Sequence, residues 1–367
     1  MKVLHVISDR NLGGAGVLLC NLLRNFDPTR VQSTVALPKD SALIQRLADI
    51  GVPVVELQND PDRAHPASIK EITNLIGSLA PNVIHANAAL SARIAGRRCG
   101  VRVVHTRHCC FPLSGIWRFS PVRWLGGVWN CRLSDRVIAT ADAAAADLVR
   151  LGIPTERIEV VINGSEPVRE LTEAELADYR KRWSIGKDDF TVGICARLVA
   201  CKGHETFLRA AKAVMEKLPR QGFVFLIAGN GERKDVLEEM AESLGIADHV
   251  RFLGFLSDPA PFYRLLRVNV NCSSGTETSC LALSEGMSAG VPAVVSDYGG
   301  NASMIGDSLA GIVYPVGDAE ALADAICRIA NDPMLEARMK QAAYSRYCEH
   351  YTATQMAERV MQLYESL

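Results

Sequence analysis

Residues 268–296 read VNVNCSSGTETSCLALSEGMSAGVPAVVS, a stretch that combines a strand, a loop, a helix and the start of another strand. Val268–Asn271 is typical of a short strand, and the residues after Ser279 are predicted to open a helix. Gly290-Val-Pro292 ends that helix, and Ala293–Ser296 begins the next strand. A strand–helix–strand unit of this kind predicts parallel strands whose sheet is covered by helices.

The same alternation of short strand-like runs and longer amphipathic runs extends along almost the whole chain. In the first half the strand candidates are Lys2–Ile7, Ser33–Leu37, Val52–Leu57, Val83–Ala86, Val101–Thr106, Arg136–Ala139 and Ile158–Ile162. The helix candidates between them include Gly16–Phe26, Ser41–Ile50, Ser68–Leu79 and Ala143–Leu151. In the second half the strand candidates are Thr191–Ala196, Phe223–Ala228, Arg251–Leu253, Val268–Asn271, Ala293–Ser296 and Gly311–Tyr314. The pattern predicts an α/β protein with two Rossmann-like, doubly wound parallel-sheet domains.

The alternation pauses at a stretch rich in Glu and Arg, which we interpret as a connector at residues 169–184. It separates an N-terminal domain, residues 1–168, from a C-terminal domain, residues 185–349. The last segment, about 350–367, starts with the capping-box pattern Thr352-x-x-Gln355 and is predicted to be a helix. Ligands of such sheets bind beyond the carboxyl ends of the strands, so we expect the two domains to face a deep cleft.

Composition excludes several classes of protein. Apolar residues make up 48% of the 367 residues and the net charge is −1, so nothing global favours nucleic acid. The 11 cysteines are scattered without paired CxxC motifs, which argues against a zinc site and favours buried thiols in a reducing compartment. The first apolar run is too short for a signal peptide, so we expect a cytoplasmic protein, with peripheral attachment to the inner face of a membrane left open.

The loop and helix within residues 275–292 carry the strongest chemical signal. Backbone N–H groups around Ser279–Leu281 lie at the start of the predicted helix, a favourable position for a diphosphate. Glu277 precedes this helix and Glu285 lies two turns into it, so each carboxylate can accept hydrogen bonds from a different polyol. We therefore predict a site for a ligand that contains both hydroxyl and phosphate groups.

Glu277-x7-Glu285, followed by Gly-Met-Ser-Ala-Gly-Val-Pro, resembles the donor-site motif of the retaining glycosyltransferases of family 4, which have the GT-B fold. Further segments resemble that family in the order it requires: Leu12-Gly13-Gly14, His105-Thr-Arg-His108, Val161-Ile-Asn163-Gly164, Ala196-Arg197-Leu198 with Lys202-Gly203, Ile227-Ala-Gly229-Asn-Gly231, and Val250 to Gly254-Phe255. The resemblance spans essentially the whole chain.

The resemblance implies a metal-independent, retaining hexosyltransferase that needs no cofactor. Its donor would be a nucleotide-diphosphate sugar, with UDP favoured, and its acceptor a saccharide or a lipid-linked molecule in cell-surface glycan or glycolipid assembly. It also implies that the last helix packs back on the first domain. Retention of configuration rests on the resemblance alone.

The resemblance also assigns roles to individual residues. The catalytic set is Glu277 at the donor sugar, Arg197 and Lys202 at the diphosphate, and His108 near the reacting sugar or acceptor. The leaving diphosphate is thought to help deprotonate the acceptor. The donor-binding set is Gly14, Gly229, Gly254, Phe255, Ser279, Cys280, Leu281 and Glu285, of which Glu285 would hold the ribose hydroxyls.

Several positions depart from the family pattern. Ala196 replaces a glycine, and Glu277-Thr-Ser-Cys-Leu replaces Glu-Gly-aromatic-Gly-Leu, which predicts a stiffer loop and leaves the sugar open. Ser303 stands where a glutamate is common, and Asn87 where a second histidine follows His85.

Other motifs favour simpler interpretations. Asp60-Pro-Asp62 spells the DxD of metal-dependent transferases, but it lacks their surroundings and we predict a turn. Gly13-Gly14-Ala-Gly16 lacks the third glycine of a dinucleotide fingerprint because position 19 is Leu, and the chain has no GxxxxGK[ST] motif. His85 and His105 lie inside strand runs and are predicted to be core residues.

A segment at 116–132 contains Trp117, Trp124 and Trp129, interleaved with Arg118, Arg123 and Arg132. This composition suits a membrane interface or a lipid-linked acceptor, although tryptophans that fill the core or rim the cleft explain it equally well. Two functional alternatives also remain: a nucleotide-sugar 2-epimerase, and a non-catalytic relative that binds nucleotide sugar or glycan. The presence of Glu277, Glu285, Arg197 and Lys202 together argues against the second.

Overall fold

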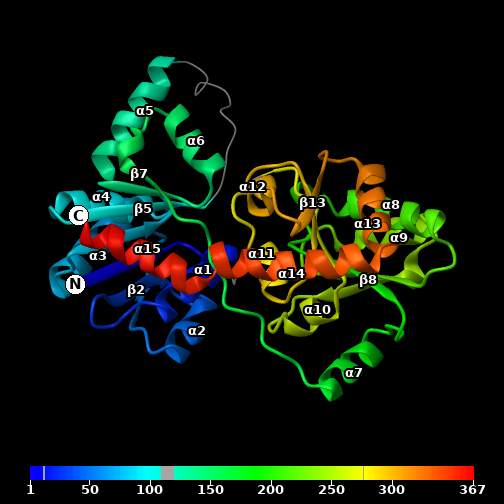
Figure 1. Cartoon of the computed structure of the whole chain (residues 1–367). Coiled ribbons are helices and arrows are strands. Elements are labelled where there is room, and N and C mark those ends of the chain that lie inside the picture. The colour runs from blue at the N-terminus through cyan, green and yellow to red at the C-terminus, as the bar shows by residue number, and fades with distance from the viewer. Residues whose placement is uncertain (11–12, 109–119, 276) are drawn as a thin grey trace. The chain divides into compact units, whose positions relative to one another are not determined.

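The computed structural model describes residues 1–10, 13–108, 120–275 and 277–367, without the side chains of 120–123 (Figure 1). The chain divides into two compact units. The first combines Met1–Ser165 with Thr352–Leu367, and the second is Glu166–Tyr351. Each contains a parallel sheet with helices on both faces, which confirms the predicted α/β class.

The first unit is built on a seven-stranded sheet of order β3-β2-β1-β4-β5-β6-β7. Its strands are β1 (Lys2–Ile7), β2 (Gln32–Pro38), β3 (Val54–Leu57), β4 (Val83–Asn87), β5 (Arg102–Arg107), β6 (Arg136–Ala139) and β7 (Ile158–Val160). Its helices are α1 (Gly14–Arg24), α2 (Leu43–Asp49), α3 (Pro66–Leu79), α4 (Leu90–Arg98), α5 (Ser120–Leu133), α6 (Asp142–Arg150) and α15 (Ala353–Glu365), with η2 (Thr155–Arg157) before β7. The strand order reverses direction between β1 and β4, where ligands of such sheets bind.

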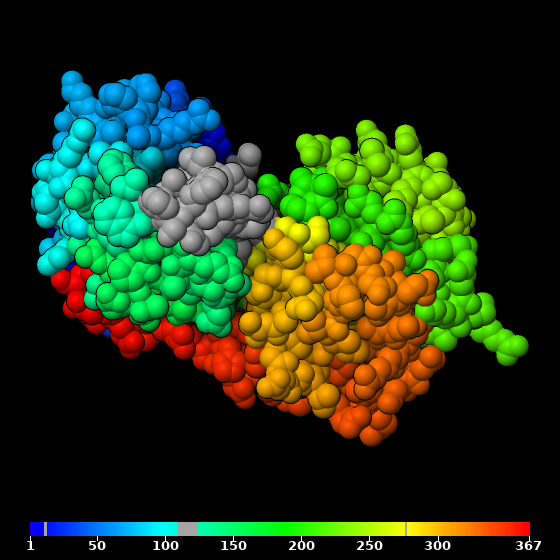
Figure 2. All heavy atoms as spheres, turned by 90° about the horizontal axis from the view of Figure 1, so that it is seen from above, coloured from blue at the N-terminus to red at the C-terminus, as the bar shows by residue number. Residues whose placement is uncertain are grey.

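Helix α15 belongs to the first unit although it ends the chain, as predicted. Thr352 and Gln355 form the predicted capping box at its start. Near its end, the buried Tyr364 hydroxyl lies 2.5 Å from Nδ1 of His85 on β4. The red spheres of Figure 2 show α15 lying along the first unit.

The second unit has a six-stranded parallel sheet of order β10-β9-β8-β11-β12-β13. Its strands are β8 (Phe190–Cys195), β9 (Phe223–Ala228), β10 (Val250–Gly254), β11 (Val268–Asn271), β12 (Ala293–Ser296) and β13 (Gly311–Tyr314). Its helices are α7 (Glu173–Arg182), α8 (His204–Lys217), α9 (Lys234–Ser243), α10 (Ala260–Leu265), α11 (Leu281–Ser288), α12 (Asn301–Ile305), α13 (Ala319–Ala330) and α14 (Pro333–His350), with the short turns η3 (Ala200–Lys202) and η4 (Ala247–His249). Here the order reverses between β8 and β11.

Burial explains why these strands read as continuous apolar runs. All six residues of β9 are buried, as expected for a parallel strand with helices on both sides. The stretch 169–184, predicted as a connector, is instead part of the second unit. Trp183 is buried there in an apolar cluster and contacts Tyr179, so the segment is fixed by packing that its charged composition concealed.

Three smaller expectations have mixed outcomes. Asp62 N–H donates to Asp60 Oδ1 at 2.9 Å, so Asp60-Pro-Asp62 is a turn as predicted. None of the nine described cysteines is in a disulfide, but Cys99 and Cys348 are exposed, so the expectation of buried thiols was too general. Within the described ranges, no helix has the length and apolarity needed to span a membrane.

Candidate functional site

The candidate site of the second unit lies at the carboxyl ends of its strands, on both sides of the point where the strand order reverses. The loop after β8 carries Arg197 and Lys202, and the loop after β11 carries Glu277 and leads to Glu285 on α11. The topology therefore brings together two segments that are separated along the sequence by three helices and three strands, from α8 to β11.

Close backbone approaches join these loops. Leu198 N–H donates to Asn230 O at 3.0 Å, and Gly229 N–H donates to Gly254 O at 2.8 Å. A Cβ atom on Gly229 would lie 2.0 Å from Ala196 O, and its φ of +135° is also unfavourable for other residues. Glycine is therefore required at 229 for the predicted diphosphate and nucleotide loops to meet.

The loop of Lys202 is held against the loop of Glu277 in a similar way. Ser274 N–H donates to Cys201 O at 2.8 Å. Gly203 has a φ of +68°, and a Cβ atom there would lie 2.2 Å from Cys272 O. The glycine after Lys202 thus permits the contact that places this lysine beside Glu277.

Lys202 and Glu277 form an ion pair at the centre of the site, with 2.6 Å between Nζ and Oε2. The two side chains are only 17% and 8% exposed. Burial by itself raises the pKa of Glu277, but the Lys202 charge and the hydrogen bonds to the carboxylate outweigh it and hold the pKa below its ordinary value. For Lys202, burial lowers the pKa and Glu277 raises it, and the net pKa shift is upward. Both groups are charged at neutral pH.

The two oxygens of Glu277 have different surroundings. Oε2 accepts hydrogen bonds from Lys202 Nζ at 2.6 Å, from Ser273 Oγ at 2.7 Å and from Asn271 Nδ2 at 3.5 Å. The described residues provide no corresponding donor to Oε1. One oxygen is anchored in the protein, and the other can accept a hydrogen bond from a ligand hydroxyl.

Glu285 is positioned by a different residue. The buried Tyr263 of α10 donates its hydroxyl to Glu285 Oε2 at 2.8 Å. Burial, followed by the nearby Cys195 and Glu285, raises the pKa of Tyr263 well above its ordinary value, so the hydroxyl remains a donor. Because α11 begins at Leu281, Glu285 lies just over one turn into the helix, not two as predicted.

The other residues of the predicted diphosphate and donor-binding sets in the second unit differ in exposure and in their partners. Arg197 is exposed, and its guanidinium has no ion-pair or hydrogen-bond partner among the described residues. Cys280 is the N-cap of α11, but its N–H points at Met304 Sδ at 3.2 Å, so this donor is already engaged. Thr278 and Ser279 are buried, whereas Phe255 is 52% exposed beside Gly254.

In the first unit, His108 follows β5 and lies near the carboxyl ends of the central strands. Its Nε2 is 3.1 Å from Asn87 Oδ1, and burial lowers the pKa of His108 to about 4. A small pocket of about 30 Å³ adjoins His85, Asn87 and His108. Gly14 is the first residue of α1, and a Cβ atom there would meet nothing within 4 Å.

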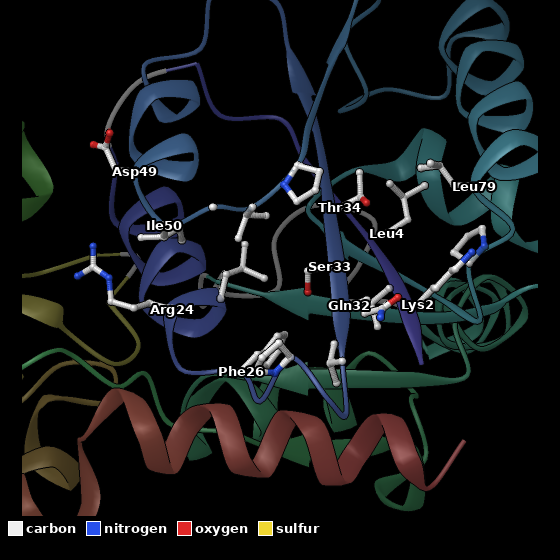
Figure 3. A pocket seen from close by; sticks show the side chains of 18 residues that line it. Lys2, Leu4, Arg24, Phe26, Gln32, Ser33, Thr34, Asp49, Ile50 and Leu79 are labelled. Atoms are coloured by element: carbon white, nitrogen blue, oxygen red, sulfur yellow. The ribbon is translucent and has the colours of Figure 1, made fainter.

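A larger cavity of about 840 Å³ lies elsewhere in the first unit (Figure 3). Lys2, Gln32 and Ser33, at the amino ends of β1 and β2, line it together with Phe26 and Leu79. It is therefore at the opposite end of the strands from His108 and includes none of the predicted site residues.

Two family models match the chain. Residues 12–169 match "Glycosyltransferase Family 4", and residues 177–346 match "Glycosyl transferases group 1". The chain belongs to this glycosyltransferase family. Together the matches span most of the sequence and both units, so the expected family and class of enzyme are confirmed.

Curated relatives of this transferase carry consistent names. A putative glycosyltransferase EpsD of Bacillus subtilis is 28% identical over 324 residues, which cover 84% of this chain and 83% of that protein. A D-inositol 3-phosphate glycosyltransferase of Kribbella flavida is 28% identical over 281 residues, covering 71% of this chain and 66% of that protein.

Solved structures confirm the GT-B fold of the transferase. HepE from Anabaena, solved with UDP, has a TM-score of 0.86 at 21% identity over the full length of both chains. A putative UDP-N-acetylglucosamine 2-epimerase from Listeria monocytogenes has a TM-score of 0.70 at 16% identity, covering 100% of this chain and 96% of that one. At these identities the likeness shows the fold alone.

Sequence reasoning missed several residues that contact the predicted set. Asn87 was noted only as a departure from the family, yet it hydrogen-bonds His108. Tyr263 carried no motif and could not be linked to Glu285 without the fold. Asn271 and Ser273 gave a visible signal, because polar residues are unusual at the end of a buried parallel strand.

Proposed function

We propose that this transferase moves a hexose from a UDP-sugar to its acceptor with retention of configuration and without a metal ion. The observation that carries the proposal is the Lys202–Glu277 pair, which leaves Glu277 Oε1 available to a hydroxyl and joins the loop of Glu277 to the loop that carries Arg197 and Lys202. We base the proposed retention of anomeric configuration on the family resemblance alone. The choice of UDP is supported by the fold relative HepE, which was solved with UDP and with UDP-glucose.

Each group has a definite task in this proposal. Arg197 and Lys202 bind the diphosphate and stabilise the charge that develops on it as the bond to the sugar breaks. These two cations take the place that a divalent metal occupies in other transferases. Glu277 Oε1 accepts a hydrogen bond from a sugar hydroxyl, and Glu285 binds the ribose with Tyr263 holding its second oxygen. By the family resemblance, His108 contacts the reacting sugar or the acceptor, and Gly14 approaches the diphosphate.

The acceptor is a saccharide or a lipid-linked molecule, and we propose that α5 contacts the inner face of a membrane. Trp124, Leu125 and Trp129 of this helix are 65%, 59% and 56% exposed. They share one helical face with the exposed Arg132, and α5 contains no acidic residue. Exposed indole rings with a cation at the helix end suit an anionic lipid surface.

A binding screen followed by a transfer assay tests the donor and the metal. In thermal-shift measurements we expect UDP to raise the unfolding temperature more than GDP or ADP, and a UDP-hexose to do so as well. Transfer with the best donor should continue in EDTA. A strict requirement for Mn²⁺ would contradict the metal-independent assignment, and isomerisation of the donor without any acceptor would identify an epimerase instead.

A further inference from the structure

A cluster of four buried polar residues lies directly beneath Glu277. Asn271 ends β11, Ser273 follows it, Ser296 ends β12 and Asn301 begins α12. Their exposed fractions are 7%, 1%, 0% and 0%. The sequence separates them by up to 30 residues, and the fold brings them together beside the donor-site loop.

The hydrogen bonds of the cluster form a closed ring. Asn301 Nδ2 donates to Asn271 Oδ1 at 3.3 Å and to Ser296 Oγ at 3.2 Å. Asn271 Oδ1 also accepts from Ser273 N–H at 2.9 Å, and Ser296 Oγ donates to Ser273 O at 2.6 Å. The ring thus binds both backbone polar groups of Ser273 and fixes the direction of its side chain.

That direction matters because Ser273 Oγ donates to Glu277 Oε2 at 2.7 Å. The orientation of Asn271 has a second consequence. With its oxygen occupied by two donors, its Nδ2 points at Glu277 Oε2 and, at 3.2 Å, at Cys280 Sγ. The cluster therefore contacts the first and last residues of the 277–280 loop.

Stability alone does not account for this arrangement. Burying polar groups costs free energy that hydrogen bonds only offset, and apolar side chains usually serve such positions at least as well. Asn301 Oδ1, moreover, is buried without a hydrogen-bond partner among the described residues. Burying such a group beside a ligand-binding carboxylate costs free energy, and this cost is better explained if the group positions the carboxylate.

We propose that Asn271, Ser273, Ser296 and Asn301 are positioning residues that turn Glu277 Oε2 inward and present Oε1 to the sugar of the donor. The inference rests on the proposed function, because it takes the ligand of Glu277 to be that sugar. It assigns to the cluster the preference for a nucleotide sugar over the bare nucleotide. It leaves the nucleotide affinity to Arg197, Lys202 and Glu285.

Calorimetric titration with UDP and with UDP-glucose tests this assignment in Ser273→Ala and Asn301→Ala. The measured quantity is the ratio of the two Kd values, since only UDP-glucose carries a sugar. We expect each variant to reduce the preference for UDP-glucose by about fivefold or more, as for loss of a hydrogen bond to a charged group, while the Kd of UDP changes less than twofold. Ser273→Thr, which keeps the hydroxyl, should retain more of the preference than Ser273→Ala.

Asn269→Ala is the matched control. Asn269 is 1% exposed on the same strand, but its Nδ2 donates to Ala282 O and not to the cluster. It should lower the unfolding midpoint without changing the ratio. An unchanged ratio in folded Ser273→Ala overturns the inference even if Asn301→Ala does not fold. If the wild-type protein gains no affinity from the sugar of UDP-, GDP- or ADP-sugars, the proposed function fails first, and this inference with it.

Discussion

Lys202 and Glu277 each occupy a position at which an unpaired charge would be unfavourable. Their side chains are largely buried, and the ion pair is supported by Ser273 and Asn271 on the carboxylate side. Removing one partner would leave an uncompensated charge, which costs more than loss of the pair as a whole. Loss of activity on mutating either residue can therefore reflect stability as well as donor binding.

A pair of variants separates these effects. We expect Lys202→Met to lower the free energy of unfolding by about 3 kcal/mol, because Glu277 remains buried without its cation. Adding Glu277→Gln should restore much of that stability without restoring transfer. Urea unfolding and initial rates measure the two quantities. Equal stability of the single and double variants would show that the pair is not energetically coupled.

Glu285 offers a second comparison at the same scale. Glu285→Ala should lower kcat/KM for the donor by an amount that corresponds to a loss of transition-state stabilisation on the order of 2–4 kcal/mol, because a contact proposed for the ribose is lost. Tyr263→Phe retains Glu285 and removes only the hydroxyl that orients it, so a smaller loss of about fivefold is expected. Donor saturation kinetics measure both. An effect of Tyr263→Phe as large as that of Glu285→Ala would mean that Tyr263 does more than orient the carboxylate.

At the scale of the elements, the composition of α5 does not reveal which of its tryptophans are exposed and which are buried. Tryptophans spaced among arginines fit a buried face and an exposed face equally well. The fold decides, because Gly127 packs against the backbone of Gly152, where a Cβ atom would approach Gly152 O to 2.3 Å. With Gly127 in this contact, Trp124 and Trp129 of the same helix remain exposed. Trp117, the third tryptophan of the prediction, lies outside the described residues.

Membrane contact through α5 leads to a sedimentation experiment. The wild-type protein should sediment with vesicles that contain anionic lipid, and Trp124→Ala with Trp129→Ala should reduce the bound fraction severalfold. Tyr344→Ala, which removes a 49% exposed aromatic ring from α14 of the second unit, is the control and should bind as wild type does. Equal sedimentation of the double variant and wild type would remove the support for α5 as the contact.

At the scale of the whole molecule, the histidines whose pKa is lowered by burial are distributed unevenly between the units. Burial lowers the pKa of His5 to about 3 and of His108 to about 4, and it lowers the pKa values of His85 and His105 well below the ordinary range. All four belong to the first unit, whereas His204, with a pKa lowered by burial to about 4, belongs to the second. Each is neutral in the folded protein at pH values where the unfolded chain binds a proton.

The sign of the pH dependence follows from these directions. Above pH ~6.5 neither state binds the protons, and stability is at its full value. As the pH falls from about 6.5 to about 4, each such histidine reduces the free energy of unfolding by up to about 1.4 kcal/mol per pH unit. We expect the first unit to lose protection from hydrogen exchange at a higher pH than the second. Peptide-resolved exchange, corrected for the intrinsic rate, measures this order. Simultaneous loss in both units would contradict it.

Replacing one of these histidines should flatten the profile. His5 is fully buried among Phe26, His85 and Tyr364, and His5→Phe removes one titrating group from that packing. The slope of the urea midpoint between pH 6.5 and 4.5 should decrease relative to wild type, whatever the change in stability at pH 7.5. An unchanged slope would show that His5 takes up no proton on unfolding.

The sequence by itself determined the order of strands and helices and the class of fold, and its resemblance to a family singled out Glu277, Glu285, Arg197 and Lys202 as candidate site residues. These features depend on local periodicity and on motifs within one loop or helix, and both can be recognised from residues that are close together in the sequence. The placement of 169–184 in the second unit depended on packing that its charged residues did not reveal.

Only the tertiary structure decided which residues contact one another across the chain. Lys202 reaches Glu277 over 75 positions and His85 reaches Tyr364 over 279, because the strand order, and not the sequence separation, sets which loops are neighbours. The contacts that Asn271, Ser273 and Asn301 make also depend on the order of the strands. A hydrogen bond requires two groups within about 3 Å, and only the folded sheet brings β11, β12 and α12 to that distance.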